Sequence, residues 1–254
     1  MADTVRPIRS ALLEGIPHGF LTREGGVSTG LVAGLNVGRG AGDDGAAVAE
    51  NRRRAAEAIL PDARLVTVYQ VHSPECAIVD EPWDEAGERP HADALATNRP
   101  GLLLGIVTAD CAPVLLADRA AGVIGAAHAG WKGAHGGVIE STLAAMERLG
   151  ARRGRIAAAI GPCIAQASYE VGEDFRAHFG PEDAQFFAPG RPGHAQFALE
   201  GYVAEQLRRA GIGAIDPLGL DTYGDPARFF SFRRATHANE ANYGRQFSLI
   251  GLEG

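Results

Sequence analysis

Two histidines and one cysteine stand out as residues whose types could hold a metal ion. Each of them follows a run of strand-like residues, at the point where a sheet usually carries its ligand sites; they are His72, Cys111 and His128. Two imidazoles and one thiolate suit a Zn²⁺ ion that keeps its fourth position open, which is typical of catalytic zinc sites. The same ligands also bind copper, so the residues alone do not fix the metal.

Two other interpretations use the same three residues. They could be a buried free cysteine and two hydrogen-bonded core histidines, because no short ligand motif joins them. Alternatively, Cys111 could act as a nucleophile with His128 as its base. The sequence contains no H-E-x-x-H, no zinc-deaminase signature, no G-x-S-x-G and no P-loop, which excludes several common classes of enzyme site.

Further polar residues lie in glycine-rich stretches that could approach a ligand closely. The turn at 130–137 follows His128 and could present backbone N–H groups to a phosphate. The loop at 22–38 is equally rich in glycine, although a plain flexible turn would look the same. From these stretches and from the C-terminal region we select four candidate substrate-binding residues: Arg23, Asn36, Lys132 and Arg234.

The elements that must position these residues follow from hydrophobic periodicity and turn signals. Strands are predicted at 65–72, 77–80, 102–107, 113–116, 123–127, 155–162, 229–234 and 244–250. Helices are predicted at 46–59, 138–149, 174–179 and 199–210, and residues 180–195 read as irregular. Because strands and helices do not alternate strictly, the pattern favours a single α+β domain with mixed, layered sheets and flanking helices.

The composition narrows the class of protein. The chain has 254 residues, a net charge of −7 and no extended basic cluster, so nucleic acid and anionic membranes are not expected partners. No segment reads as a membrane span or a signal peptide, and three cysteines do not suggest a disulfide framework. We expect a cytoplasmic protein that acts on a small molecule; the sequence does not indicate an oligomeric state.

A series of short motifs runs in order along nearly the whole chain. They are T-R-E-G-G-V-S-T-G (22–30), L-N-V-G (35–38), G-D-D (42–44), Q-V-H (70–72), A-D-A-L-A-T (92–97), T-A-D-C-A-P-V (108–114), A-A-H-A-G-W-K-G (126–133), G-P-C-I (161–164), Y-E-V-G (169–172), F-F-S-F-R-R (229–234) and G-R-Q (244–246). In these motifs the chain resembles the YfiH-type laccase-domain family, whose members carry the names polyphenol oxidase, purine nucleoside phosphorylase and peptidoglycan editing factor. Because the resemblance covers nearly the whole chain, residues 1–254 are interpreted as one domain of this type.

The resemblance implies that the family's metal ligands fall on His72, Cys111 and His128. It also implies a metal-supported enzyme that cleaves adenosine, inosine and methylthioadenosine with phosphate, with adenosine deamination as a second activity. Zinc is the expected cofactor and copper the alternative. Two positions depart from the pattern of many relatives, which have a histidine in place of Gly40 and a cysteine in place of Asp221.

Three other functions stay open at this stage. A copper-dependent polyphenol oxidoreductase would explain the laccase name, but the chain has 8 histidines and no His-x-His pair, so at most one metal ion is supported. A Cys/His hydrolase that edits cell-wall precursors would use Cys111 and His128 directly. A non-catalytic interaction protein stabilised by a metal is the third possibility.

Overall fold

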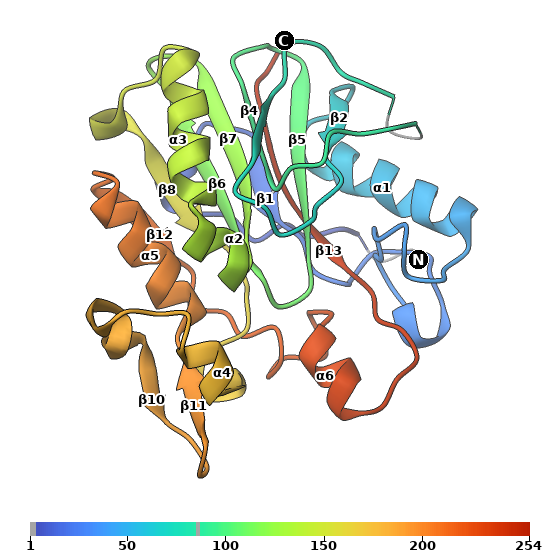
Figure 1. Cartoon of the computed structure of the whole chain (residues 1–254). Helices are drawn as coiled ribbons and strands as arrows, with labels where there is room; N and C mark the ends of the chain where they lie inside the picture. Colours follow the sequence, from blue (N-terminus) through green and yellow to red (C-terminus); the bar gives the residue numbers. More distant parts are fainter. Residues whose placement is uncertain (1–3, 85–86) are drawn as a thin grey trace.

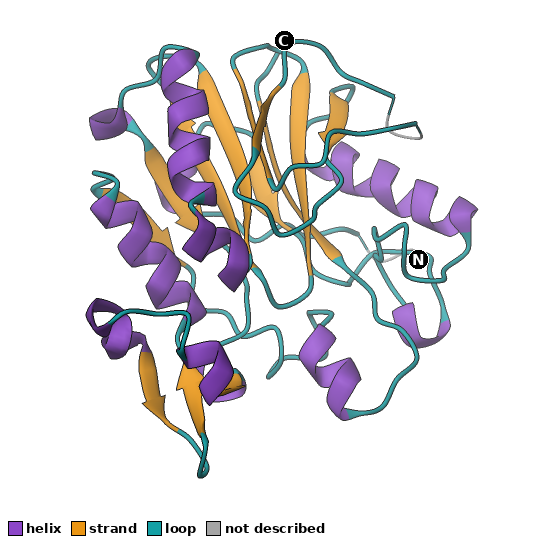
Figure 2. Cartoon of the chain, in the orientation of Figure 1, coloured by secondary structure: helices purple, strands orange, loops and turns teal. Residues whose placement is uncertain are grey.

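A computed structural model describes residues 4–84 and 87–254 of the chain. Two sheets are packed face to face, and helices cover their outer faces (Figures 1 and 2). Helix α1 (Gly45–Ile59) lies on the first sheet, while α3 (Val138–Arg148) and α5 (Leu199–Arg209) lie on the second. The predicted α+β fold with layered, mixed sheets is therefore confirmed.

The first sheet has four strands and the second has six. The order in the first is β1 (His18–Phe20), β13 (Gln246–Gly251), β5 (Leu102–Thr108) and β2 (Arg64–Thr67). The order in the second is β12 (Ala214–Pro217), β8 (Ala157–Ile160), β6 (Ala112–Asp118), β7 (Val123–Ala129), β4 (Ala94–Thr97) and β3 (Cys76–Ile78). The pairs β2–β5, β3–β4 and β8–β12 are parallel, and the other neighbours are antiparallel.

The remaining elements are short. A small third sheet joins β10 (Phe187–Pro189), β11 (His194–Phe197) and β9 (Glu170–Gly172). The short α-helices are α2 (Trp131–Gly136), α4 (Glu173–Arg176) and α6 (Phe232–His237). Turns of 3₁₀-helix span Ala11–Leu13, Gly30–Val32, Arg153–Arg155, Gln166–Ser168 and Pro181–Phe186.

The central strands are apolar throughout because both of their faces are covered. In β6, Leu115 and Ala117 pack against the first sheet, whereas Val114 and Leu116 pack under α3 and α5. Successive side chains of a strand point to opposite faces, so one uninterrupted apolar run serves two separate layers of core.

The chain passes from one sheet to the other between β5 and β6. Only Ala109, Asp110 and Cys111 separate these two strands, and Asp110 adopts a left-handed conformation with φ +86°. A sharp reversal of this kind allows consecutive strands to belong to different sheets. It also places Cys111 where the ends of both sheets meet.

The strand predicted at 229–234 is wrong. Residues 232–237 form helix α6, whose N-cap is Ser231; its hydroxyl accepts a hydrogen bond from the N–H of Arg234 at 3.1 Å. The aromatic run suggested a strand, but Phe229 and Phe230 are buried while Phe232 is 49% exposed. The capping serine decides the local structure because it satisfies a free N–H of the first helical turn.

Other boundaries also differ from the prediction. Strand β2 ends at Thr67, well before His72, and the structure from 131 to 136 is a helix rather than a turn, with Gly137 breaking it from α3 at φ +99°. Residues 180–195 contain a 3₁₀-helix and strand β10 instead of irregular chain. Within residues 4–84 and 87–254, no helix is both long and apolar enough to cross a membrane.

We expect Gly161→Ala to destabilise the protein by about 1–3 kcal/mol, which is the cost of overpacking a filled core. A Cβ at this position would lie 2.0 Å from Cδ1 of Phe20, a ring that is fully buried. Gly154→Ala is the matched control, because a Cβ there meets no atom within 4 Å. Equal denaturation midpoints for the two variants would show that the contact between the two sheets is not tightly packed.

Candidate metal centre

The three predicted ligands lie together. The side-chain nitrogen and sulfur atoms of His72, Cys111 and His128 are all within 4.8 Å of one another. Within residues 4–84 and 87–254, this is the one group of at least three such side chains close enough to share an ion. His128 is buried on β7 with 4% exposure, whereas His72 is exposed in the loop after β2, so one side of the cluster faces solvent.

A buried carboxylate fixes the orientation of His128. Nδ1 of the imidazole lies 2.7 Å from Oδ1 of Asp93, which is fully buried. The carboxylate accepts a hydrogen bond from Nδ1–H and leaves Nε2 to face a metal ion, as in carboxylate–histidine–zinc arrangements. Burial lowers the pKa of His128, but Cys111 and Asp93 outweigh it and the pKa rises to about 9. Burial in turn raises the pKa of Asp93, but its hydrogen bonds prevail and the pKa falls to about 2.

The same carboxylate also holds the loop that carries His72. Oδ2 of Asp93 accepts hydrogen bonds from the N–H of Val71 at 3.1 Å and from the N–H and hydroxyl of Ser73 at 2.6 and 2.9 Å. These donors flank His72, which needs a left-handed backbone with φ +61° to point toward the cluster. One side chain therefore positions two ligands.

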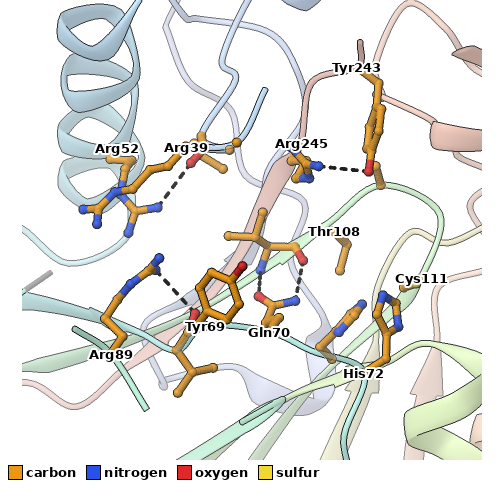
Figure 3. Close-up of a pocket in the computed structure, with 17 residues that line it drawn as sticks. Arg39, Arg52, Tyr69, Gln70, His72, Arg89, Thr108, Cys111, Tyr243 and Arg245 are labelled. Atoms are coloured by element: carbon orange, nitrogen blue, oxygen red, sulfur yellow. Dashed lines mark hydrogen bonds between the residues drawn. The ribbon is translucent and has the colours of Figure 1, made fainter. Parts of the chain in front are cut away.

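Gln70 attaches the loop on its other side. Its amide nitrogen donates to the carbonyl of Val107 on β5, and its amide oxygen accepts from the N–H of Val107, both at 2.8 Å. The side chain thus takes the place of a neighbouring strand at the edge of β5 (Figure 3). Because β5 leads directly to Cys111, this pairing sets the position of His72 relative to the thiol.

Cys111 is placed by its neighbour Asp110. The buried carboxylate of Asp110 accepts hydrogen bonds from the hydroxyls of Thr222 at 2.7 Å and Ser231 at 3.0 Å, and from the N–H of Arg233 at 2.6 Å. Burial raises the pKa of this carboxyl, against these three hydrogen bonds that lower it. The reversal that carries Cys111 is therefore tied to the start of helix α6.

The cluster fits a metal ion in its packing as well as in its donor atoms. Gly130 lies against it, and a Cβ there would stand 2.8 Å from Nδ1 of His72 and 2.9 Å from Sγ of Cys111. Glycine is therefore required at this position for the three donors to approach one another. Two imidazoles and one thiolate suit zinc and also copper, so His72, Cys111 and His128 are the residues that would hold the ion.

Two cavities meet at the cluster. The cationic cavity, of about 500 Å³, is lined by Arg39, Arg52, Arg89 and Arg245 (Figure 3). No carboxylate lines it among the described residues. The aromatic cavity, of about 310 Å³, is lined by Trp131, Tyr169, Phe232 and Tyr243, with Ile164, Leu199 and Arg233. Both cavities contain His72, Ala109, Cys111 and Tyr243 in their walls, and both fall within or near the usual size of ligand pockets.

The four candidate substrate-binding residues lie outside the lining of both cavities. Arg23 donates to the carbonyls of Ala33 and Pro226 and stacks on Phe230, and Arg234 donates to the carbonyls of Thr222, Tyr223 and Phe229. Arg23 and Arg234 line a separate cavity of about 250 Å³. Lys132 is exposed on α2, where its charge contributes to lowering the pKa of His72, after burial and the neighbouring His128.

Asn36 connects the glycine-rich loop to the C-terminal part of the cationic cavity. Its carbonyl oxygen accepts from the N–H of Gly38 at 3.1 Å and of Arg245 at 3.0 Å, and its amide donates to Asp43 at 2.8 Å. It is fully buried and therefore orients the backbone that carries Arg245. Asn36 therefore supports the wall of the cationic cavity without lining the cavity itself.

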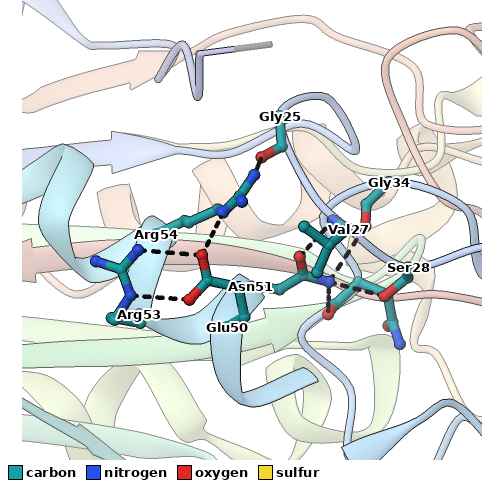
Figure 4. Close-up of polar contacts among 9 residues, drawn as sticks. Gly25, Val27, Ser28, Gly34, Glu50, Asn51, Arg53 and Arg54 are labelled. Atoms are coloured by element: carbon teal, nitrogen blue, oxygen red, sulfur yellow. Dashed lines mark hydrogen bonds and ion pairs between the residues drawn. The ribbon is translucent and has the colours of Figure 1, made fainter. Parts of the chain in front are cut away.

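The loop at 22–38 is fixed rather than free. Asn51 of α1 accepts from the N–H of Val27 and donates to Ser28, Gly34 and Asn36 (Figure 4). Arg54 reaches the carbonyl of Gly25 from the same helix and pairs with Glu50. The glycines allow the loop to pack closely on itself, because a Cβ on Gly26 or Gly34 would overlap the backbone of another part of the loop. Helix α1, which holds the loop, also contributes Arg52 to one wall of the cationic cavity.

The structure shows where Gly40 and Asp221, the two departures from the pattern of the family, lie. Gly40 lines the cationic cavity, so a histidine at this position would stand in that cavity. The carboxylate of Asp221 accepts from the N–H groups of Ala165 and Tyr223 and from the hydroxyl of Ser168, and so closes a loop away from the ligands.

Comparison with known proteins agrees with this structure. The family described as multi-copper polyphenol oxidoreductase laccase matches residues 17–253, and the chain belongs to this family. A purine nucleoside phosphorylase of Deinococcus radiodurans is 41% identical over 249 residues, covering 97% of this chain and 93% of the relative. One of Streptomyces coelicolor is 41% identical over 225 residues, covering 87% and 91%.

Solved structures show the same fold. YfiH of Bacillus licheniformis superposes with a TM-score of 0.88 at 28% identity, covering 98% of this chain and 97% of that one. YlmD of Geobacillus stearothermophilus gives a TM-score of 0.88 at 31% identity, covering 100% and 98%. The resemblance to the YfiH-type family is therefore confirmed.

We predict that Asp93→Asn weakens zinc binding by about 10–100-fold, the usual effect of losing a carboxylate behind a histidine ligand. The amide is neutral, and its NH₂ group has no acceptor among the N–H donors of Val71 and Ser73. Zinc affinity is measured by competition with a chromogenic chelator. Asp80→Asn, at an exposed carboxylate paired with Arg99, is the control and should bind zinc as the unchanged protein does. Equal affinities in the two variants would contradict the role given to Asp93.

Proposed function

We propose that this protein is a zinc-dependent purine nucleoside phosphorylase that acts on nucleosides such as adenosine, inosine and methylthioadenosine. The names of its relatives support the class of reaction, and the donor set of His72, Cys111 and His128 supports zinc. Adenosine deamination, which the family resemblance implies, is proposed as a second activity and would be detected as ammonia released from adenosine.

The observation that carries this proposal is the cationic cavity beside the ligand cluster. Four arginines line it, in a chain whose net charge is −7. Such a concentration of positive charge favours a phosphate dianion, which arginine binds with two parallel hydrogen bonds. A hydrolase would need only water at this position.

Two donors in this cavity lack a partner. Nη1 of Arg245 and Oγ1 of Thr108 are buried and make no hydrogen bond within the described part of the chain. A buried polar group without a partner is costly, and a bound phosphate would supply acceptors for both. Nη2 of Arg245 donates to the hydroxyl of Tyr243 at 2.9 Å, which holds the guanidinium in place.

In the proposed reaction, a phosphate oxygen forms a bond to C1′ of the ribose while the C1′–N9 bond breaks. The electron pair of that bond leaves with the purine, which takes up a proton, and the products are ribose 1-phosphate and the free base. The arginines bind and orient phosphate, and the shared wall of the two cavities holds the ribose. A bound Zn²⁺ ion would supply a Lewis acid next to the sugar.

Polyphenol oxidation is not favoured as the main activity. Within the described residues a single ligand cluster is present, and the whole sequence has no His-x-His pair. We expect any oxidation of phenols to be weak and to require added copper. Robust oxygen consumption by the zinc-loaded protein would contradict this.

The role of Cys111 separates the phosphorylase from the hydrolase. As a zinc ligand its thiolate is neutralised by the metal, so alkylation should be slow with zinc bound and faster after chelation. Cys111→Ser should lose zinc and inosine cleavage together, and cleavage by the unchanged protein should require phosphate and yield ribose 1-phosphate. The measurements are mass spectrometry of alkylated protein, zinc content and product analysis.

The opposite set of results would favour the hydrolase. A covalent adduct on Cys111 with zinc still bound, and cleavage that ignores phosphate, would identify the thiol as a nucleophile. The control is Cys76→Ser, at a half-buried thiol outside the ligand cluster whose pKa burial raises to about 12. This variant should keep both zinc and activity.

Arg245→Met should raise KM for phosphate by about 10-fold or more, because a hydrogen bond to a charged group contributes roughly 1.5–3 kcal/mol. The KM for inosine should change little, since the proposal places phosphate, and not the base or the sugar, beside this guanidinium. Arg99→Met, at an exposed arginine on the surface, is the control. Phosphate kinetics at saturating inosine test this, and an unchanged KM for phosphate would place the anion elsewhere.

A further inference from the structure

The aromatic cavity has a polar group whose hydrogen-bonding capacity is only partly used. Nη1 of Arg233 donates to the carbonyl of Glu170 at 2.7 Å, and its guanidinium carbon lies 5.1 Å from the ring centroid of Tyr169. The backbone N–H of the same residue is held by Asp110. No hydrogen bond engages Nε or Nη2 within the described part of the chain, although Arg233 lines the cavity.

The walls of this cavity suit a flat, apolar-faced ligand. Trp131, Tyr169, Phe232 and Tyr243 contribute rings, and Phe232 and Tyr243 contact each other with centroids 5.0 Å apart. Phe232 is 49% exposed although it is a large apolar side chain. Aromatic side chains bind nucleobases by stacking on their faces, which is insensitive to the identity of the base.

The guanidinium of an arginine can distinguish one purine base from another, which stacking on a ring does not. Two guanidinium N–H groups match the O6 and N7 acceptors of a 6-oxopurine, which is the commonest specific contact between arginine and guanine. Adenine offers N7 but carries an amino donor at position 6, so the same fork meets a donor there. A site that supplies two donors therefore disfavours the 6-amino base.

We propose that the aromatic cavity is the base subsite and that Arg233 gives it a preference for 6-oxopurine nucleosides, inosine and guanosine, over adenosine. This inference rests on the proposed phosphorolysis. Phosphate then occupies the cationic cavity, the base occupies the aromatic cavity, and the ribose lies at their shared wall by His72 and Cys111. Arg233 remains bonded to the base as the C1′–N9 bond breaks and its electrons pass to the purine.

The first test compares kcat/KM for inosine and adenosine at fixed phosphate. The unchanged protein should favour inosine by about 10-fold or more, in the range of one bidentate arginine contact. Arg233→Met should lower the value for inosine by a similar factor and leave that for adenosine within about 2-fold. Arg176→Met is the matched control, because it also removes an arginine stacked on a ring, that of Phe187, away from the site. An unchanged ratio in a folded Arg233→Met protein would overturn the inference.

A second measurement needs neither turnover nor that variant. Calorimetry should show that the zinc-loaded protein binds inosine about 10-fold more tightly than 7-deazainosine, which lacks the N7 acceptor. Equal affinities would overturn the base subsite even if inosine is cleaved, and the proposed function would stand. The same difference in affinity without any phosphorolysis would support the subsite and refute the proposed function. Failure of both nucleosides to bind would refute both.

Discussion

The site depends on one buried carboxylate. Asp93 has no exposed surface, and its two oxygens hold the imidazole of His128 on one side and the loop around His72 on the other. A charge without solvent is costly unless hydrogen bonds surround it, and here each oxygen has strong donors. Since these bonds lie within the protein, the two histidines are oriented before any metal arrives. Cys111 then joins them through the short reversal that links the two sheets.

The two cavities differ in the kind of chemical group that their linings suit. One is lined by arginines and suits an anion, while the other is lined by rings and suits a planar base. They share Tyr243, whose hydroxyl is bonded to Arg245 and whose ring contacts Phe232. A displacement of Tyr243 would therefore change the walls of both cavities.

A feature of the site or of the fold could be predicted from the sequence when the residues that determine it are close together in the chain. The clustering of His72, Cys111 and His128 was predictable because each follows an apolar run and the motifs around them are distinctive. Arg39, Arg52, Arg89 and Arg245 were not selected, since arginines far apart in sequence carry no signal of convergence. Arg52 lies in a run of three arginines on α1, and only the helical period separates the buried one from its neighbours. Helix α6 was misread because one capping serine outweighed an aromatic run.

Strand β13 has a consequence for how the protein is made. It lies between β1 and β5 in the first sheet, although it comes from residues 246–251. On the ribosome, the first sheet therefore lacks an inner strand until this segment has emerged, and the wall that holds Arg245 is missing as well. Until β13 has been synthesised, the edge of β5 and the apolar side chains beside it stay exposed, which favours aggregation. The wall of the cationic cavity that Arg245 contributes is thus completed only after nearly the whole chain has been synthesised, and chaperone assistance would be most valuable in that interval.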